Sequence, residues 1–145
     1  SLLVQSTKSS NYYLETTINM DLTDAKGGIL LVGAAHNGFG APIAGIGIAA
    51  TKDGFSIFET INQSESILAQ KQIVLEGKIG MKMEVTEGHL LRFSFKLKEK
   101  NWESFDHVAD ANHLVPWGMG FRLGMFAKGN ENQKINFIQT NIVNK

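Results

Sequence analysis

The side chains most able to do chemistry in this 145-residue sequence are its histidines and closely spaced acids. The four histidines stand at none of the local spacings of a zinc site, and the chain has no cysteine. Two carboxylates can cleave a glycosidic bond only when the fold holds them about 5 to 9.5 Å apart. Close acidic pairs occur at Asp106 and Asp110, Glu84 and Glu87, and Glu99 and Glu103. The simplest interpretation is that these pairs lie on solvated faces and in turns, so we predict no catalytic residue.

A glycine-rich stretch from Gly45 to Ala50 matches the dinucleotide-binding fingerprint, with alanine in its last position. That fingerprint works only where a helix follows the glycines and presents its N-terminus to the pyrophosphate. Here a turn at Asp53-Gly54 follows within a few residues and leaves no room for such a helix. The stretch therefore reads as small residues in a crowded strand.

Aromatic side chains and two loops remain as candidates for touching a ligand. Sugar rings present apolar C–H faces that stack on aromatic rings, while their hydroxyls meet polar groups. The candidate ligand-binding or pocket-bordering residues are His36 and Phe39 in one glycine-containing loop, Trp102, and His113 and Trp117 in a second loop. A flexible hairpin connection is the simpler account of the first loop. For each tryptophan we expect core packing or a position that plugs the end of the sandwich.

The elements that must position these residues show period-two alternation of apolar and polar side chains. It runs through Tyr12–Leu22, which places Tyr12 inward and Tyr13 outward, and returns in Ile79–Val85 and Leu91–Leu97. The turn Glu87-Gly88 joins the last two segments, so they are predicted to form an antiparallel hairpin. Its inner face carries methionine and phenylalanine.

The remaining segments fit the same scheme of short strands. Two apolar runs without polar alternation are predicted to be central strands covered on both faces, Ile29–Val32 and Ile43–Ala50. Further strands are predicted at Phe55–Phe58, Ile67–Val74, Gly120–Ala127 and Ile135–Val143. No window has a convincing helical period. About ten strands in one domain spanning residues 1–145 predict an all-β fold, an antiparallel two-sheet β-sandwich of the jelly-roll type.

Composition excludes several classes of partner. Fourteen basic residues balance fourteen acidic ones without forming a cluster, which argues against nucleic acid and against an anionic membrane surface. The longest apolar stretches fall well short of the ~18 residues of a membrane span. The absence of cysteine excludes disulfides and thiolate metal sites, but does not fix the compartment.

The order of several motifs resembles the C-terminal concanavalin A-like β-sandwich of family 43 glycoside hydrolases, the β-xylosidase and arabinofuranosidase group. The resemblance spans nearly the whole chain. It is carried by Leu2-Leu3-Val4-Gln5, Glu15-Thr16-Thr17-Ile18, Gly28-Ile29-Leu30-Leu31-Val32, Asp53-Gly54, Leu91-Arg92-Phe93-Ser94-Phe95 with Asn101-Trp102, Trp117, and Gly120-Phe121-Arg122-Leu123-Gly124-Met125-Phe126-Ala127.

The resemblance implies a non-catalytic accessory domain. In that family the catalytic carboxylates belong to a five-bladed propeller that precedes the sandwich, and a loop of the sandwich borders the substrate pocket in some members. By position, the loop at Asn112–Trp117 or the loop around His36 and Phe39 would take that part. The resemblance also implies a plant-polysaccharide substrate for the parent enzyme and an extracytoplasmic location.

The resemblance also bears on cofactors. Family members often end with an Asp-Tyr-Phe element whose aspartate helps to hold a structural calcium ion. This chain has Asn136-Phe137-Ile138 there, and a neutral amide is a poorer ligand for calcium than a carboxylate. We therefore expect no cofactor, with at most weak calcium binding at Asn136.

Two other functions stay open. A free-standing carbohydrate-binding module or lectin would need exposed aromatic side chains on one surface, whereas the outward strand positions mostly carry Lys, Glu, Thr and Ser. A small hydrolase on a jelly-roll scaffold would rest on the scattered carboxylates alone.

Overall fold

The computed structural model describes residues 2–6, 11–20, 26–98, 100–116, 121–128 and 136–144, with backbone only for 2–6, 136–140 and 144. These residues form strands and no helix, so none of them could span a membrane as a helix. The strands are β1 Leu2–Ser6, β2 Tyr12–Asn19, β3 Lys26–Ala34, β4 Ile43–Thr51, β5 Gly54–Ile61, β6 Ser64–Gln72, β7 Lys78–Thr86, β8 Leu90–Leu97, β9 Glu103–Asp110, β10 Arg122–Lys128 and β11 Asn136–Asn144.

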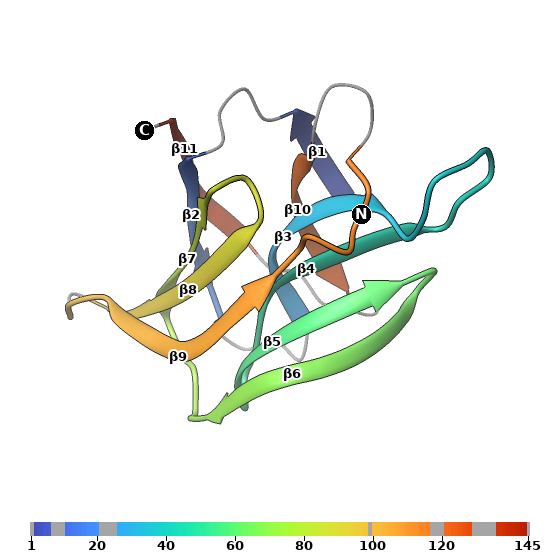
Figure 1. Cartoon of the computed structure of the whole chain (residues 1–145). Helices are drawn as coiled ribbons and strands as arrows, with labels where there is room; N and C mark the ends of the chain where they lie inside the picture. Colours follow the sequence, from blue (N-terminus) through green and yellow to red (C-terminus); the bar gives the residue numbers. More distant parts are fainter. Residues whose placement is uncertain are drawn as a thin grey trace.

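The strands build two antiparallel sheets that face each other (Figure 1). One sheet has six strands in the order β1-β10-β3-β4-β5-β6, and the other has five in the order β11-β2-β7-β8-β9. The chain crosses between the sheets after β1, β2, β6, β9 and β10, while β3 to β6 and β7 to β9 are meanders. The predicted all-β, two-sheet antiparallel sandwich is confirmed.

Alternation decides which side chains fill the space between the sheets. In β2 every second residue from Tyr12 is buried and the residues between are half-exposed, as predicted. The paired strands β7 and β8 do the same, with Met81 opposite Phe95 and Met83 opposite Phe93. The facing sheet contributes Ile46, among others, from β4. One continuous core therefore joins both sheets.

The two predicted central strands are buried on both faces, and the glycines of β4 make this possible. Gly45 and Gly47 leave room for Leu30 of the neighbouring β3: a Cβ atom on Gly47 would lie 2.6 Å from Leu30 Cβ and 2.2 Å from the Ile29 carbonyl oxygen. On this outer side Leu30 joins a second cluster, in which the rings of Phe58 and Phe126 meet edge to face at 5.5 Å. The glycine fingerprint is thus a packing feature.

Turn residues separate the strands much as predicted. Glu87 and Gly88 both have positive φ, 55° and 79°, and reverse the chain between β7 and β8. Between β5 and β6 the two-residue turn is Asn62-Gln63, whose φ values of 49° and 70° suit the right-handed twist of a hairpin.

Several bounds differ from expectation, and two strands, β1 and β9, were not predicted. Strand β6 begins at Ser64 and ends at Gln72, and its register against β5 shifts at a bulge opposite Ile57 and Phe58. Strand β9 was not predicted; it is an edge strand with mostly exposed, polar residues, so its alternation is weak. Strand β2 ends at Asn19, and the expected starts at Gly120 and Ile135 lie outside the described residues.

Substitutions of two phenylalanines measure how much this core contributes to stability. Phe93 is fully buried, whereas Phe39 is fully exposed. We expect Phe93→Ala to lower the free energy of unfolding by about 3–5 kcal/mol, because it leaves a cavity between the sheets. Phe39→Ala, the control with the same chemical change, should alter it by less than about 0.5 kcal/mol. Urea unfolding followed by circular dichroism measures both, and equal losses would contradict the two-sheet core.

Candidate functional site

The two predicted pocket-bordering loops lie at the same end of the sandwich. The β3–β4 connection, with His36 and Phe39, projects from the two sheets (Figure 1). The loop after β9 runs beside its base, where Ala34 and Val115 exchange backbone hydrogen bonds of 2.8 Å in both directions. The two loops are therefore parts of one surface. Trp117 lies outside the described residues, so its predicted role remains a prediction.

This end of the molecule carries unusually exposed apolar side chains. The Phe39 side chain is completely exposed at the tip of its loop, and His36 in the same loop has Nδ1 2.8 Å from the Asn37 carbonyl oxygen. Ile43 and Ile61 are 57% and 42% exposed, and Ile43 accepts a backbone hydrogen bond from the turn that follows Ile61. The register places Ala44 opposite Ile61, so Ile43 and Ile61 point to opposite faces of the sheet at this end. Exposed apolar side chains at the end of a sandwich can form part of an interaction surface.

His113 belongs to this end and is held by a carboxylate. Its Nε2 lies 2.6 Å from Glu59 Oε1 on β5, a partner that the sequence did not reveal. The register of β5 in its sheet brings the two together across 54 positions of sequence. This contact anchors the loop after β9 to the six-stranded sheet.

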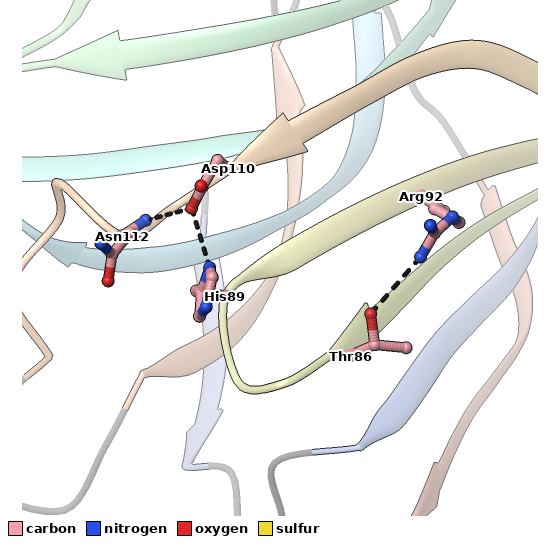
Figure 2. A network of polar contacts seen from close by, with 5 residues as sticks. All are labelled: Thr86, His89, Arg92, Asp110 and Asn112. Atoms are coloured by element: carbon pink, nitrogen blue, oxygen red, sulfur yellow. Dashed lines mark hydrogen bonds and ion pairs between the residues drawn. The ribbon is translucent and has the colours of Figure 1, made fainter.

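A second histidine–carboxylate contact lies on the five-stranded sheet (Figure 2). His89, in the β7–β8 turn, has Nδ1 2.8 Å from Asp110 Oδ1 at the end of β9, and the Asn112 backbone N–H donates to the same oxygen at 2.8 Å. Since a carboxylate only accepts, His89 Nδ1 carries the proton. Nearby, Arg92 donates a separate, longer hydrogen bond of 3.4 Å to Thr86.

These contacts lower the pKa of Asp110 below its ordinary value of 3.8. The largest cause is the Asn112 backbone hydrogen bond, followed by the His89 hydrogen bond; desolvation opposes the shift, and the charges of His89 and His113 make smaller contributions that lower the pKa. A general acid needs a raised pKa. The shift of Asp110 is the reverse, which fits a structural role.

Trp102 is the predicted site residue with the most developed surroundings. It precedes β9, and its indole lies against the outer surface of the five-stranded sheet, over Gly80 of β7. The expectation of core packing is wrong for Trp102. Because Gly80 has no side chain, the indole packs on the outer face of the sheet instead. The indole lines a groove of about 540 Å³. The other described residues of its wall are Glu15, Thr16, Thr17, Lys78, Ile79, Gly80, Lys96, Lys98 and Asn141.

The groove was not predicted, although the sequence shows that several of its residues occupy outward strand positions. Glu15, Thr17, Gly80 and Lys96 all fall on outward positions of alternating strands. Only the register, in which Thr17 lies opposite Gly80 and Gly80 opposite Lys96, places them side by side.

Metal binding finds no support in side-chain geometry. Within the described ranges, no three His, Cys, Asp or Glu side chains gather in a way that could hold a metal ion. The Asn136 backbone begins β11, while its side chain lies outside what is described. Weak calcium binding at Asn136 therefore stays a prediction.

Comparison with known proteins identifies the fold. No protein-family model and no curated protein matches the sequence. Among solved structures, the chain resembles xylan β-1,4-xylosidase from Bacillus halodurans, with a TM-score of 0.71 and 14% identity. It also resembles a mutant of the GH43 protein BlXynB from Bacillus licheniformis, with a TM-score of 0.68 and 16% identity.

These matches cover nearly all of this chain but only part of each bacterial protein. The comparison covers 99% and 97% of this chain, but only 30% and 29% of the two bacterial proteins. Sheep galectin-11 is matched over 96% of its length and 99% of this chain, with a TM-score of 0.52 and 9% identity. The resemblance to a sandwich within family 43 glycoside hydrolases is thus confirmed as a resemblance in fold.

The lowered pKa of Asp110 predicts how stability depends on pH. Its contribution to the free energy of unfolding is present above the unfolded-state pKa of about 3.9 and is lost as the pH falls through the lower folded-state value. We expect Asp110→Asn to be less stable than the parent at neutral pH, and the difference to shrink as the pH falls below the unfolded-state pKa.

Urea unfolding across this pH range measures the difference. Asp106→Asn, which removes one negative charge from an exposed position of β9, is the matched control. A difference for Asp110→Asn that is constant with pH, or that Asp106→Asn reproduces, would contradict the assignment.

Proposed function

We propose that the chain is a non-catalytic accessory domain of a glycoside hydrolase that acts on plant polysaccharide, of the xylosidase or arabinofuranosidase type. One observation carries the proposal: essentially the whole chain superposes on less than a third of each GH43 protein. In such an arrangement the rest of the parent, a catalytic propeller, supplies the residues that break the bond.

The polar contacts of the described residues support a non-catalytic role. Both histidine–carboxylate contacts are made between surface loops and strands, and among the described residues no serine or threonine hydroxyl is bound to either histidine. Nucleophilic catalysis needs such a hydroxyl or thiol within hydrogen-bond reach of its base. Glycoside hydrolysis by two carboxylates needs one acid with a raised pKa, and the shifted acid here, Asp110, is lowered.

The exposed apolar end supports the place of docking. Phe39 lies at the tip of the β3–β4 loop, while Ile43 and Ile61 lie at strand ends near its base; burying them would remove apolar surface from water at about 25 cal/mol per Å². We propose that this end packs on the catalytic propeller and that the loops of His36 and His113 border its substrate pocket. Their shared surface makes both loops, rather than one, candidates for that border.

A free-standing carbohydrate-binding module is the second candidate function. The groove beside Trp102 favours it, because it joins an aromatic ring to polar side chains on one open sheet face. An accessory domain needs a parent gene that also encodes a propeller, and its apolar end is buried against that propeller. A free-standing module has no propeller, and its apolar end stays exposed to solvent.

Activity measurements separate these functions. We expect residues 1–145 alone not to hydrolyse 4-nitrophenyl β-xyloside or α-arabinofuranoside, and the full-length parent, recovered from the gene that encodes this chain, to hydrolyse at least one of them. Hydrolysis by residues 1–145, or a gene without a propeller upstream, would contradict the accessory role.

Charge substitutions locate the docking surface. In the full-length parent, Phe39→Asp should lower the melting temperature by several degrees, because it buries a charge at the docking surface. Val74→Asp is the matched control: Val74 is 79% exposed, and the backbone of the adjacent Leu75 is bonded to Lys52 in the β4–β5 turn, at the end opposite Ile43. Neither change should affect residues 1–145 alone, and equal effects in the parent would contradict docking through this end.

A further inference from the structure

The groove of Trp102 lies on the outer face of the five-stranded sheet, away from the apolar end loops. Its floor crosses β2 and β7, where Thr17 lies opposite Gly80, and it extends to Asn141 on β11 and to Lys96 on β8. With about 540 Å³, it has the size of a small-molecule site. Sequence reasoning assigned no role to the lysines on its wall.

One wall of the groove is aromatic and fixed in place. A Cβ atom on Gly80 would lie 3.0 Å from Trp102 Cη2 and 3.4 Å from Cζ3, so the indole rests directly on the glycine backbone. Lys82 Nζ lies 4.5 Å from the centre of the indole and Lys96 Nζ lies 5.9 Å from it. Such cation–π contacts hold ammonium groups beside the ring.

The charge on the groove is predominantly positive. Lys78, Lys96 and Lys98 line it against one acid, Glu15. None of these three lysines forms an ion pair with a described carboxylate, and Glu15 accepts a hydrogen bond of 3.3 Å from Asn141 Nδ2. In a chain with no net charge, this concentration of cations is local. It favours an anionic ligand.

We propose that this groove binds a saccharide bearing uronic acid residues. The Trp102 ring would stack on the C–H face of one sugar, while the lysine ammonium groups pair with its carboxylate. Thr17, Asn141 and Glu15 lie at the far side, where they would hydrogen-bond to hydroxyls. The choice of a sugar rests on the proposed function, whereas the need for an anion rests on the groove alone.

The positive charge and the shape of the groove separate this ligand from two alternatives. A neutral oligosaccharide would leave the three lysines without a role. An apolar ligand fits better in the smaller pocket of about 270 Å³ on the other sheet, where Leu30, Phe58 and Phe126 form much of the wall. Carboxylated sugars occur in plant cell-wall polysaccharides, so the ligand class agrees with the proposed parent.

Calorimetric titration of residues 1–145 tests the proposal. The probes are trigalacturonate, its methyl ester, xylotriose and inorganic phosphate. We expect trigalacturonate to bind at least about tenfold more tightly than the uncharged ester or xylotriose, because only the acid pairs with the lysines. Raising the salt from about 0.05 to about 0.5 M should weaken that binding. Phosphate should not compete, since it offers nothing to stack on Trp102.

Variants assign the binding to this groove. Trp102→Ala and the double change Lys96→Met with Lys98→Met should each weaken trigalacturonate binding by about fivefold or more. Lys128→Met is the control and should bind like the parent, because Lys128 lies on β10 of the other sheet. Far-ultraviolet circular dichroism and the melting temperature check that each variant is folded. The lysine pair keeps its aliphatic stems, so it remains informative if Trp102→Ala is unstable.

Four outcomes would overturn the proposal: no binding, equal binding of the acid and its ester, competition by phosphate at similar concentration, or unchanged binding in folded groove variants. Any of them leaves the accessory role intact, because that role is tested by hydrolysis in the full-length parent. Conversely, uronate binding by a chain whose gene encodes no propeller would support the groove and contradict the accessory role.

Discussion

The burial of alternate side chains between two sheets is the interaction on which the rest of this structure depends. Met81, Met83, Phe93 and Phe95 of one sheet face Ile46 and its neighbours of the other, and their removal from water stabilises both sheets together. Once these residues point inward, the residues between them must point outward. The core therefore determines what each outer face can present to a ligand.

The two outer faces of the sandwich therefore carry different kinds of side chains. On the six-stranded sheet, Gly45 and Gly47 let Leu30 lie flat, and the phenylalanines beside it close an apolar cluster. On the five-stranded sheet a single glycine, Gly80, provides a seat for Trp102, while lysines surround the ring. In both cases the missing side chain leaves space that a large side chain fills: Leu30 from the neighbouring strand, and Trp102 from the β8–β9 connection.

The ends of the sandwich add a third kind of surface. Contacts between a strand and a loop fix the loop after β9, through Val115 with Ala34 and through His113 with Glu59. The Phe39 loop beside it remains exposed and apolar. An accessory domain needs one surface for its enzyme, and a sandwich can present a loop-rich end for docking while leaving both outer sheet faces open.

The sequence alone determined the all-β architecture, the inward residues of β2, β7 and β8, and the small-residue strand β4, because alternation and side-chain size are local properties. It did not reveal β9, whose edge position leaves little alternation to detect. Nor did it pair His113 with Glu59 or place Trp102 over Gly80. Those contacts join residues far apart in the chain, and only strand register and the stacking of the two sheets decide which distant side chains meet.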